Sequence, residues 1–262
     1  MATIAVLSQK GGTGKTTTVR TLADIFQRIG LEVLAVDLDP QGNLSDYFDV
    51  PADADPTIAD VLAGKARAVD AIHNGVLPAN LGLAEAELVL GGKMGREMTL
   101  RRALRDIKRR YDVVLIDCPP ALGLLTVNAV VAADFALIST EAQYFSLQGV
   151  EQALEIIELA KDNLHPDLEW LGIVLNIADL RTIHSREALA QLRDRFDDKL
   201  FGAVIRSSIR YAESAERAVS ILDYRPELGA DYLALADEVL SRVGFDEERS
   251  RLADLRRELV PV

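Results

Sequence analysis

A glycine-rich segment near the N-terminus carries the residue types that bind phosphate. It follows the apolar run at 4–7 and continues into an amphipathic stretch. Glycine lets backbone N–H groups curve around phosphate oxygens, and the N-terminus of a following helix attracts the same anion. Lys15 is expected to reach the β- and γ-phosphates, and Thr16 to bind Mg²⁺ through its hydroxyl. We therefore expect a nucleoside triphosphate to contact Gly11, Gly12, Thr13, Gly14, Lys15, Thr16 and Thr17.

The segment departs from the standard phosphate-loop pattern at one point. The pattern has glycine where this chain has Gln9, and an additional lysine, Lys10, follows directly. The apolar run before the loop and the helical pattern after it still favour a bound nucleotide over a glycine-rich turn without a ligand. The additional cation is therefore the feature that distinguishes this loop.

Three carboxylates lie at the ends of apolar runs, where a phosphate loop needs a partner for its metal ion. Asp117 ends the run at 113–116 and is expected to be the metal-associated residue. Asp37 and Asp39 follow the run at 33–36, and an extended chain places two residues at this spacing on one face. We expect Asp39 to orient the attacking water and Asp37 to support the Mg²⁺ shell. A turn at the Asp-Pro step is the alternative without chemistry.

Strands and helices must bring these residues to one place. Near-continuous apolar runs predict strands buried on both faces, and they occupy residues 4–7, 33–36, 113–116, 135–138, 171–175 and, more weakly, 203–205. Amphipathic patterns between them predict helices at residues 16–29, 97–109, 145–161, 185–196 and 227–243. This alternation predicts an α/β fold with a doubly wound, mostly parallel sheet flanked by helices, the fold of P-loop NTPases.

The remaining segments predict loops and short helices. Residues 49–57 are typical of a surface loop, and Thr57 is expected to cap a short helix that ends near Leu62. The tail at 245–262 has leucines at helical spacing with mixed charges, which favours a docked or partner-facing helix over a membrane-surface helix. We expect one P-loop ATPase domain over residues 1–262, without an N-terminal helix-turn-helix.

Composition and charge exclude several classes of protein. The chain has 262 residues, about half of them apolar, and no apolar run long enough for a transmembrane helix. No signal peptide is expected. Cys118 is the one cysteine, which excludes an intrachain disulfide, fits the reducing cytoplasm and argues against an iron–sulfur cluster held by two cysteines per subunit. The net charge of −12 means that any DNA binding needs a local basic patch and should depend steeply on salt.

Jointly, these motifs resemble the ParA/Soj family of partitioning ATPases. The similarity rests on the phosphate loop and on two segments that contain the carboxylates, Val36–Asn43 and Leu115–Thr126. Residues 94–104 and 141–149 add to it, so that the resemblance covers roughly residues 1–240. It implies an enzyme that binds ATP with Mg²⁺ and hydrolyses it to ADP and phosphate at a weak basal rate.

The resemblance also implies a cycle of assembly and release. Members of the family close as an ATP-bound sandwich homodimer, in which Lys10 would reach the nucleotide of the other subunit, as an arginine finger does elsewhere. Lys10, Lys15 and Asp39 would be the catalytic residues. The dimer would bind double-stranded DNA without sequence preference, on the nucleoid in the cytoplasm. A ParB-like partner would stimulate hydrolysis and release it, so that chromosomal or plasmid DNA is partitioned.

The residues that would contact DNA follow from the same resemblance. Arg181 and Arg210 fall on the family's DNA-binding positions, and Arg186, Arg206 and Arg217 are neighbouring candidates. A single surface arginine is otherwise a solvated charge. DNA contact is therefore expected of the group rather than of any one member.

The base of the nucleotide is expected beside two strand ends. By resemblance, Asn176, Ile205 and Arg206 would line the adenine. The chain has Ile-Arg-Ser-Ser at 205–208 where the family usually has Ile-Pro-Arg-Asn, so the local base contacts differ. The segment at 176–179 lacks the lysine of the guanine-reading Asn-Lys-x-Asp pattern, which favours ATP over GTP.

Other functions of the same fold are alternatives. A ParA-like ATPase that positions another intracellular cargo, such as a protein cluster, would have the same motifs. A small-molecule ligase or synthetase would need a dedicated substrate pocket. A membrane-cycling division regulator would need a cationic amphipathic C-terminal helix, and a tyrosine-kinase relative a tyrosine-rich tail, whereas the last tyrosine is Tyr232.

Overall fold

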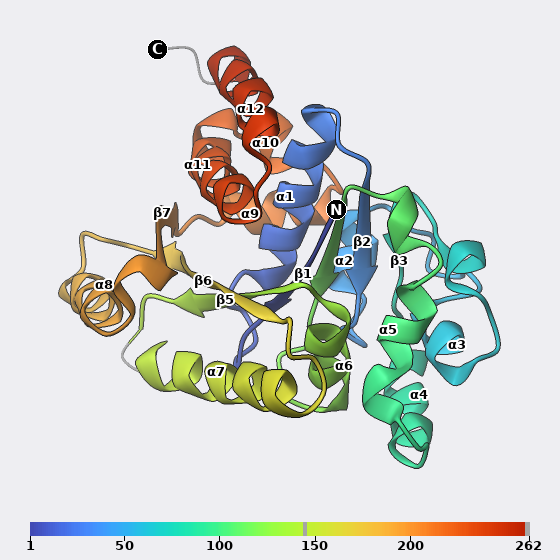
Figure 1. Ribbon diagram of the computed structural model, residues 1–262. Coiled ribbons are helices and arrows are strands. Elements are labelled where there is room, and N and C mark those ends of the chain that lie inside the picture. The colour runs from blue at the N-terminus through green and yellow to red at the C-terminus, as the bar shows by residue number, and fades with distance from the viewer. Residues whose placement is uncertain (144–145, 260–262) are drawn as a thin grey trace.

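The computed structural model describes residues 1–143 and 146–259, and a sheet of seven strands lies at its centre (Figure 1). The strands are β1 Ala2–Leu7, β2 Val33–Asp37, β3 Val76–Leu77, β4 Val113–Asp117, β5 Phe135–Glu141, β6 Glu169–Ala178 and β7 Leu200–Arg206. They lie in the order β3-β2-β4-β1-β5-β6-β7, and every pairing between them is parallel. The doubly wound α/β fold predicted from the sequence is confirmed.

Helices cover both faces of this sheet. The α-helices are α1 Lys15–Arg28, α2 Asn43–Tyr47, α3 Ile58–Ala63, α4 Gly82–Gly91, α5 Thr99–Leu104, α6 Leu124–Ala132, α7 Ser146–Asn163, α8 Ile183–Phe196, α9 Arg210–Glu216, α10 Ile221–Tyr224, α11 Pro226–Arg242 and α12 Asp246–Leu259. Short 3₁₀ helices are η1 Ala68–Ala71, η2 Arg96–Met98, η3 Lys108–Arg110 and η4 Asp197–Lys199. Within the described ranges, no helix is both long and apolar enough to cross a membrane.

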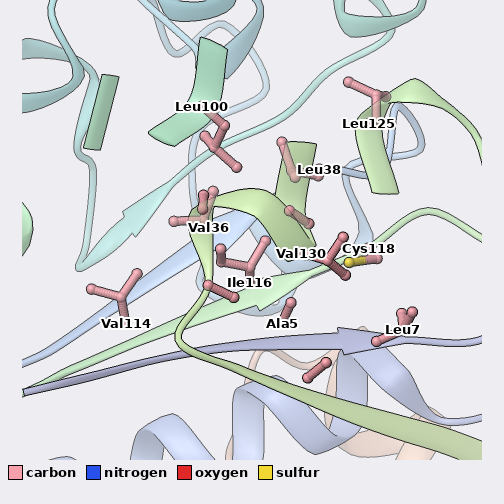
Figure 2. Close-up of a cluster of buried hydrophobic side chains, with 14 of the residues drawn as sticks. Ala5, Leu7, Val36, Leu38, Leu100, Val114, Ile116, Cys118, Leu125 and Val130 are labelled. Atoms are coloured by element: carbon pink, nitrogen blue, oxygen red, sulfur yellow. The ribbon is translucent and has the colours of Figure 1, made fainter. Parts of the chain in front are cut away.

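The side chains of β1 alternate between two hydrophobic cores. Ile4 and Val6 pack with residues of α1, α11 and α12, whereas Ala5 and Leu7 pack with residues of α3, α5, α6 and α7. Figure 2 shows part of the second core around Ile116, between the sheet and the helices above it. Because both faces of the central strands are buried, most strand residues are apolar, which explains the apolar runs in the sequence.

Most of the predicted elements are confirmed. Every apolar run lies within a strand, and α1, α8, α11 and α12 form where helical patterns occur, although 260–262 lie outside the described residues. The helix predicted over 145–161 is α7, described from Ser146. Thr57 precedes α3, and its N–H donates to the carboxylate of Asp60 at 3.1 Å, as in a capping box.

The helix predicted over 97–109 is wrong in its extent. Regular α-helix covers only α5, and the 3₁₀ helices η2 and η3 lie on either side of it. Leu104 and Ile107 remain buried although the chain turns between them. The spacing of apolar residues therefore reflects which side chains enter the core. Short 3₁₀ turns can bury the same side chains without a continuous α-helix.

The carboxyl ends of the central strands meet at one edge of the sheet. Asp117 is in register with Val6 of β1 and with Asp37 of β2, and Glu141 of β5 is in register with Asn176 of β6. Open α/β sheets bind their ligands at this edge. The topology therefore brings the predicted phosphate, metal and base residues together.

The opposite end of β6 holds the one tryptophan of the chain, Trp170. Its ring packs edge-on against that of Phe196, with 5.8 Å between the centroids. The ammonium of Lys199 lies 5.7 Å from the indole centroid and donates a hydrogen bond to the Trp170 carbonyl. One end of β6 therefore packs against aromatic and basic side chains, and the other end lies at the edge that holds the predicted site residues.

Candidate active site

The phosphate loop connects β1 to α1 and curves around an open cavity. Gly12 and Gly14 have φ values of 79° and 81°, in the left-handed region that favours glycine. A Cβ on Gly14 would lie 3.2 Å from the side chain of Asn176, so a larger residue would require this side chain to move. Residues 11–17 all line a cavity of about 650 Å³, which is in the size range of ligand pockets.

Lys15 is buried at the base of the loop by contacts with loop atoms. Its Nζ donates to the Ser8 hydroxyl at 2.9 Å and to the Lys10 carbonyl at 3.2 Å. The Thr13 hydroxyl donates to the same Ser8 oxygen at 2.9 Å. Burial lowers the pKa of Lys15, while the nearby carboxyl of Asp117 acts in the opposite direction. The ammonium is thus held where phosphate oxygens would surround it.

A second buried network fixes the loop from the side of β5 and β6. The Ser139 hydroxyl donates to the Thr13 carbonyl at 2.6 Å and accepts from Nδ2 of Asn176 at 2.6 Å. The same amide donates to Thr18 at 3.3 Å, and the Thr18 hydroxyl donates to the Gly14 carbonyl at 2.8 Å. Sequence reasoning did not find Ser139. The available signal was a hydroxyl at the end of an otherwise apolar run.

The predicted metal residues Thr16 and Asp117 are in direct contact. The Thr16 hydroxyl donates to Oδ2 of Asp117 at 2.6 Å, and Oδ1 of the same buried carboxyl has no hydrogen-bond partner among the described residues. Burial, together with the neighbouring Asp37, raises the pKa of Asp117 to about 8. A hydroxyl beside a carboxylate with an unused oxygen fits Mg²⁺, which prefers oxygen ligands and keeps substrate phosphates in its shell.

Asp37 holds the chain that follows β2. The side chain is fully buried, and its Oδ1 accepts from the Asp39 N–H at 3.0 Å. Its Oδ2 accepts from the N–H and the hydroxyl of Ser45 at 2.9 and 2.8 Å. Burial raises the pKa of Asp37 to about 6. Both oxygens therefore already serve the protein, and support of the Mg²⁺ shell by Asp37 stays a prediction.

Asp39, the predicted water-orienting residue, lies at the edge of the sheet where the phosphate loop begins. It is partly exposed and lines the cavity together with the phosphate loop. Its Oδ1 accepts from the N–H of Gln41 at 3.0 Å. The carboxylate is thus positioned by its own turn and by Asp37, with access to the cavity.

The predicted base residues line the same cavity as the phosphate loop. Asn176, Ile205 and Arg206 lie on its wall together with the tyrosines Tyr211 and Tyr232. The guanidinium of Arg206 is occupied by Asp231, with Nε 2.8 Å from Oδ2, and by the Glu227 carbonyl. Apolar and aromatic surface on this wall suits a purine ring, while the phosphates lie at the loop.

The five predicted DNA-binding arginines differ in their partners. Three form ion pairs, namely Arg181 with Asp179, Arg206 with Asp231 and Arg210 with Glu213. The other two form no ion pair within the described ranges. Arg186 donates to the carbonyls of residues 180 and 181, and Arg217 lies 5.2 Å from the ring centroid of Tyr224.

Lys10 is exposed and lies outside the nucleotide cavity of its own chain. It is absent from the described residues that line the cavity, and it borders a small separate hollow that includes Ser8 and Glu141. Burial raises the pKa of Glu141, and the charge of Lys10 opposes this. The two lysines of the loop are therefore directed to different places, Lys15 to the cavity and Lys10 beside it.

Comparison with known proteins supports a nucleotide site of this kind. Residues 1–170 match the AAA domain family. The chain is 40% identical over 245 residues to the chromosome-partitioning ATPase Soj of Thermus thermophilus, covering 92% of this chain and 96% of that protein. It is 38% identical over 261 residues to the chromosome partitioning protein ParA of Caulobacter vibrioides, covering 95% and 96%.

Solved structures of similar proteins contain nucleotide and metal. Cobyrinic acid a,c-diamide synthase from Mycobacterium smegmatis, with bound ADP and magnesium, is 35% identical with a TM-score of 0.75, covering 88% of this chain and 93% of that one. The septum site-determining protein MinD from Pyrococcus horikoshii, with Mg-ADP, is 29% identical with a TM-score of 0.76, covering 93% and 98%. The chain is a P-loop ATPase whose cofactors are ATP and Mg²⁺. With its phosphate loop, its two carboxylate segments and this identity, it belongs to the AAA domain family and, within it, to the Soj/ParA family of partitioning ATPases.

Proposed function

We propose that this ATPase partitions DNA through a cycle of dimerisation, DNA binding and release. With ATP and Mg²⁺ bound, two copies close over their nucleotides and the homodimer binds double-stranded DNA without sequence preference, which places it on the nucleoid in the cytoplasm. Hydrolysis, stimulated by a ParB-like partner, returns the chain to a form that leaves DNA. Thr16 and Asp117 would hold the Mg²⁺, which would supply positive charge to the phosphates, and Asp39 would orient the attacking water.

The placement of Lys10 is the observation that carries the proposal. A lysine on the phosphate loop is close to the nucleotide, yet Lys10 is exposed beside the cavity rather than on its wall. Lys15 already supplies the cation within the chain. An exposed lysine at the cavity's edge supports a role on the nucleotide of a second copy, where it would stabilise the charge that develops during phosphoryl transfer.

Dimerisation is tested by comparing Lys10→Ala with Lys65→Ala, a change at another exposed lysine. Sedimentation is measured with a non-hydrolysable ATP analogue and Mg²⁺. The wild type and Lys65→Ala should sediment as dimers, whereas Lys10→Ala should bind the analogue as a monomer and lose hydrolysis. A Lys10→Ala variant that still dimerises and hydrolyses ATP at the wild-type rate would show that Lys10 has no role in trans.

DNA binding is proposed for the arginines at the β6 and β7 end of the sheet. Phosphates must compete with carboxylates for Arg181, Arg206 and Arg210, whereas Arg186 and Arg217 need release no acidic partner. The arginine side chains of these pairs are exposed to solvent, which weakens the pairs, so DNA can displace them. We expect the group to give a net basic surface only when the acidic partners turn away, which makes binding sensitive to the conformation of the dimer.

The DNA proposal is tested with Arg210→Glu and, as a control, Arg257→Glu on the distant helix α12. Arg210→Glu should lose DNA binding while ATP-dependent dimerisation persists, and Arg257→Glu should retain both. The logarithm of the binding constant should fall with the logarithm of the salt concentration by about 0.9 per phosphate neutralised. A flat salt response, or equal loss in both variants, would contradict a local basic patch.

The partner is tested with proteins encoded beside this chain's gene, among which we expect one that binds DNA. Adding it to the DNA-bound ATP form should raise the rate of phosphate release and shorten the residence on DNA. Asp39→Ala should remain on DNA in its presence, because orientation of the water is lost. Stimulation instead by a neighbouring protein that binds no DNA would indicate the positioning of a different cargo.

A further inference from the structure

Positive charge is concentrated in one segment of this acidic chain. Residues 93–110 contain eight basic and two acidic side chains, a net charge of +6, whereas the chain as a whole carries −12. The remaining residues therefore carry −18. The segment includes α5 and η3, which lie beside α3 and α4 at the β3 and β2 side of the sheet, and α8 lies at the other end (Figure 1). It is therefore separate from the arginines proposed for DNA.

A groove with an apolar floor runs along this basic segment. Its volume is about 540 Å³, and α3, η1, α5 and η3 contribute its walls. Val69 and Ala103 on the floor are partly buried against the hydrophobic core. Met94 borders the groove and is fully exposed. The groove thus presents apolar surface to solvent in a concave shape, a form that suits side chains of a partner.

The rim of the groove is mostly basic. Its one acidic residue among the described lining, Asp106, is exposed and lies 3.7 Å from Arg105. Arg102 and Arg110 form no ion pair among the residues described, and both are exposed. Lys93 donates to the carbonyls of Leu62 and Ala63 at the end of α3 and, in the part of the chain that the structure describes, forms no ion pair. Arg67, also on the rim, is paired with a neighbouring aspartate. An anionic partner would therefore gain two guanidinium groups without breaking an existing ion pair.

We propose that this groove binds an acidic amphipathic helix of a partner protein, with apolar side chains on the floor and carboxylates at the Arg102 and Arg110 rim. Such a helix offers carboxylates to the basic rim and apolar side chains to the floor at the same time. Duplex DNA would contact the rim but leave the floor unfilled, because its backbone offers no apolar groups. A flat bilayer surface does not follow a concave floor. A second copy of this chain is an alternative source of acidic surface.

The test uses a fluorescein-labelled helical peptide with leucines along one face and glutamates on the other. Its binding is measured by fluorescence polarisation to the full chain and to two double variants. Arg102→Glu with Arg110→Glu changes the groove, whereas Arg101→Glu with Arg109→Glu makes the same charge change at positions of the same segment that do not line it and that form no ion pair among the described residues. ATP binding by all three proteins serves as the test of folding.

The groove variant should bind the peptide at least about tenfold more weakly than the wild type, and the control variant within about twofold. A peptide of the same composition with its leucines scrambled should bind weakly to all three proteins. Equal loss in both variants, or equal binding of the scrambled peptide, would overturn the proposal in favour of unspecific charge attraction. Binding of duplex DNA or of anionic vesicles, or self-association, that is lost only in the groove variant would overturn it in favour of those partners.

Discussion

Ser139→Ala tests whether the phosphate loop depends on a hydroxyl that lies 126 residues away in sequence. The Ser139 side chain is 1% exposed and makes two hydrogen bonds of 2.6 Å, to the Thr13 carbonyl and from the Asn176 amide. Alanine leaves a buried acceptor and a buried donor without their partner. Each unsatisfied group costs about 1–3 kcal/mol, and the amide keeps its contact with Thr18. We therefore expect the free energy of unfolding to fall by about 2–4 kcal/mol.

The same change should weaken nucleotide binding. A loop that is no longer held at Thr13 must be ordered when ATP binds, which costs free energy. A cost of about 1.4 kcal/mol corresponds to a tenfold weaker affinity. Urea unfolding followed by circular dichroism measures stability, and calorimetric titration with ATP and Mg²⁺ measures affinity.

Thr140→Val is the matched control, because Thr140 is the next residue of β5, is 7% exposed and makes no side-chain hydrogen bond among the described residues. No side-chain hydrogen bond is lost in this change, so we expect stability to change by less than about 1 kcal/mol. Wild-type stability and affinity in Ser139→Ala would refute the reasoning.

Three further predictions concern the catalytic residues. Lys15→Ala should abolish ATP binding in calorimetric titration, since the loop loses its buried cation; retained affinity would contradict the role of Lys15. Asp39→Ala should bind ATP and dimerise but release no phosphate, and a variant that stays monomeric with ATP would contradict the proposed role of its carboxylate. Asp117→Asn should abolish Mg²⁺-dependent hydrolysis yet raise the unfolding temperature of the nucleotide-free chain at about pH 8. Burial raises the pKa of Asp117 above its unfolded value, so ionisation destabilises the folded wild type as pH rises. The difference should shrink toward about pH 4, and an unfolding temperature below that of the wild type at the higher pH would contradict this explanation.

Long, regular elements were predictable because one physical signal dominates each of them. The strands β1, β2 and β4 are buried on both faces, and α1 has one apolar stripe. The helix α6 was missed because it is almost entirely buried, so that its sequence lacks a polar face and any 3.6-residue periodicity. The strand β3 has two residues, too few for an alternating pattern. The strand β3 forms by pairing with β2, and no feature of its local sequence indicates this pairing.

The residues that line the cavity were predictable from their motifs. The hydrogen bonds and ion pairs among the site residues were less predictable. The loop residues, Asp39 and Asn176 all line one cavity, as their motifs predict. The bond from Ser139 to Thr13 depends on β5 lying beside β1, which follows from the sheet order. The bonds from Ser45 to Asp37 depend on the turn between β2 and α2, which brings the two residues together. Ion pairing of Arg181, Arg206 and Arg210 likewise depends on side-chain directions that spacing alone does not specify.

The position of Trp170 gives this chain an intrinsic optical probe. With one tryptophan in the sequence, emission excited at the indole band comes from a single place, the contact of β6 with Phe196 and Lys199. Asn176 at the nucleotide cavity is six residues further along the strand, about 20 Å away. ATP therefore does not quench the indole by contact. A change of wavelength or intensity on nucleotide binding therefore reports a change of conformation or of assembly, rather than contact of the indole with the nucleotide.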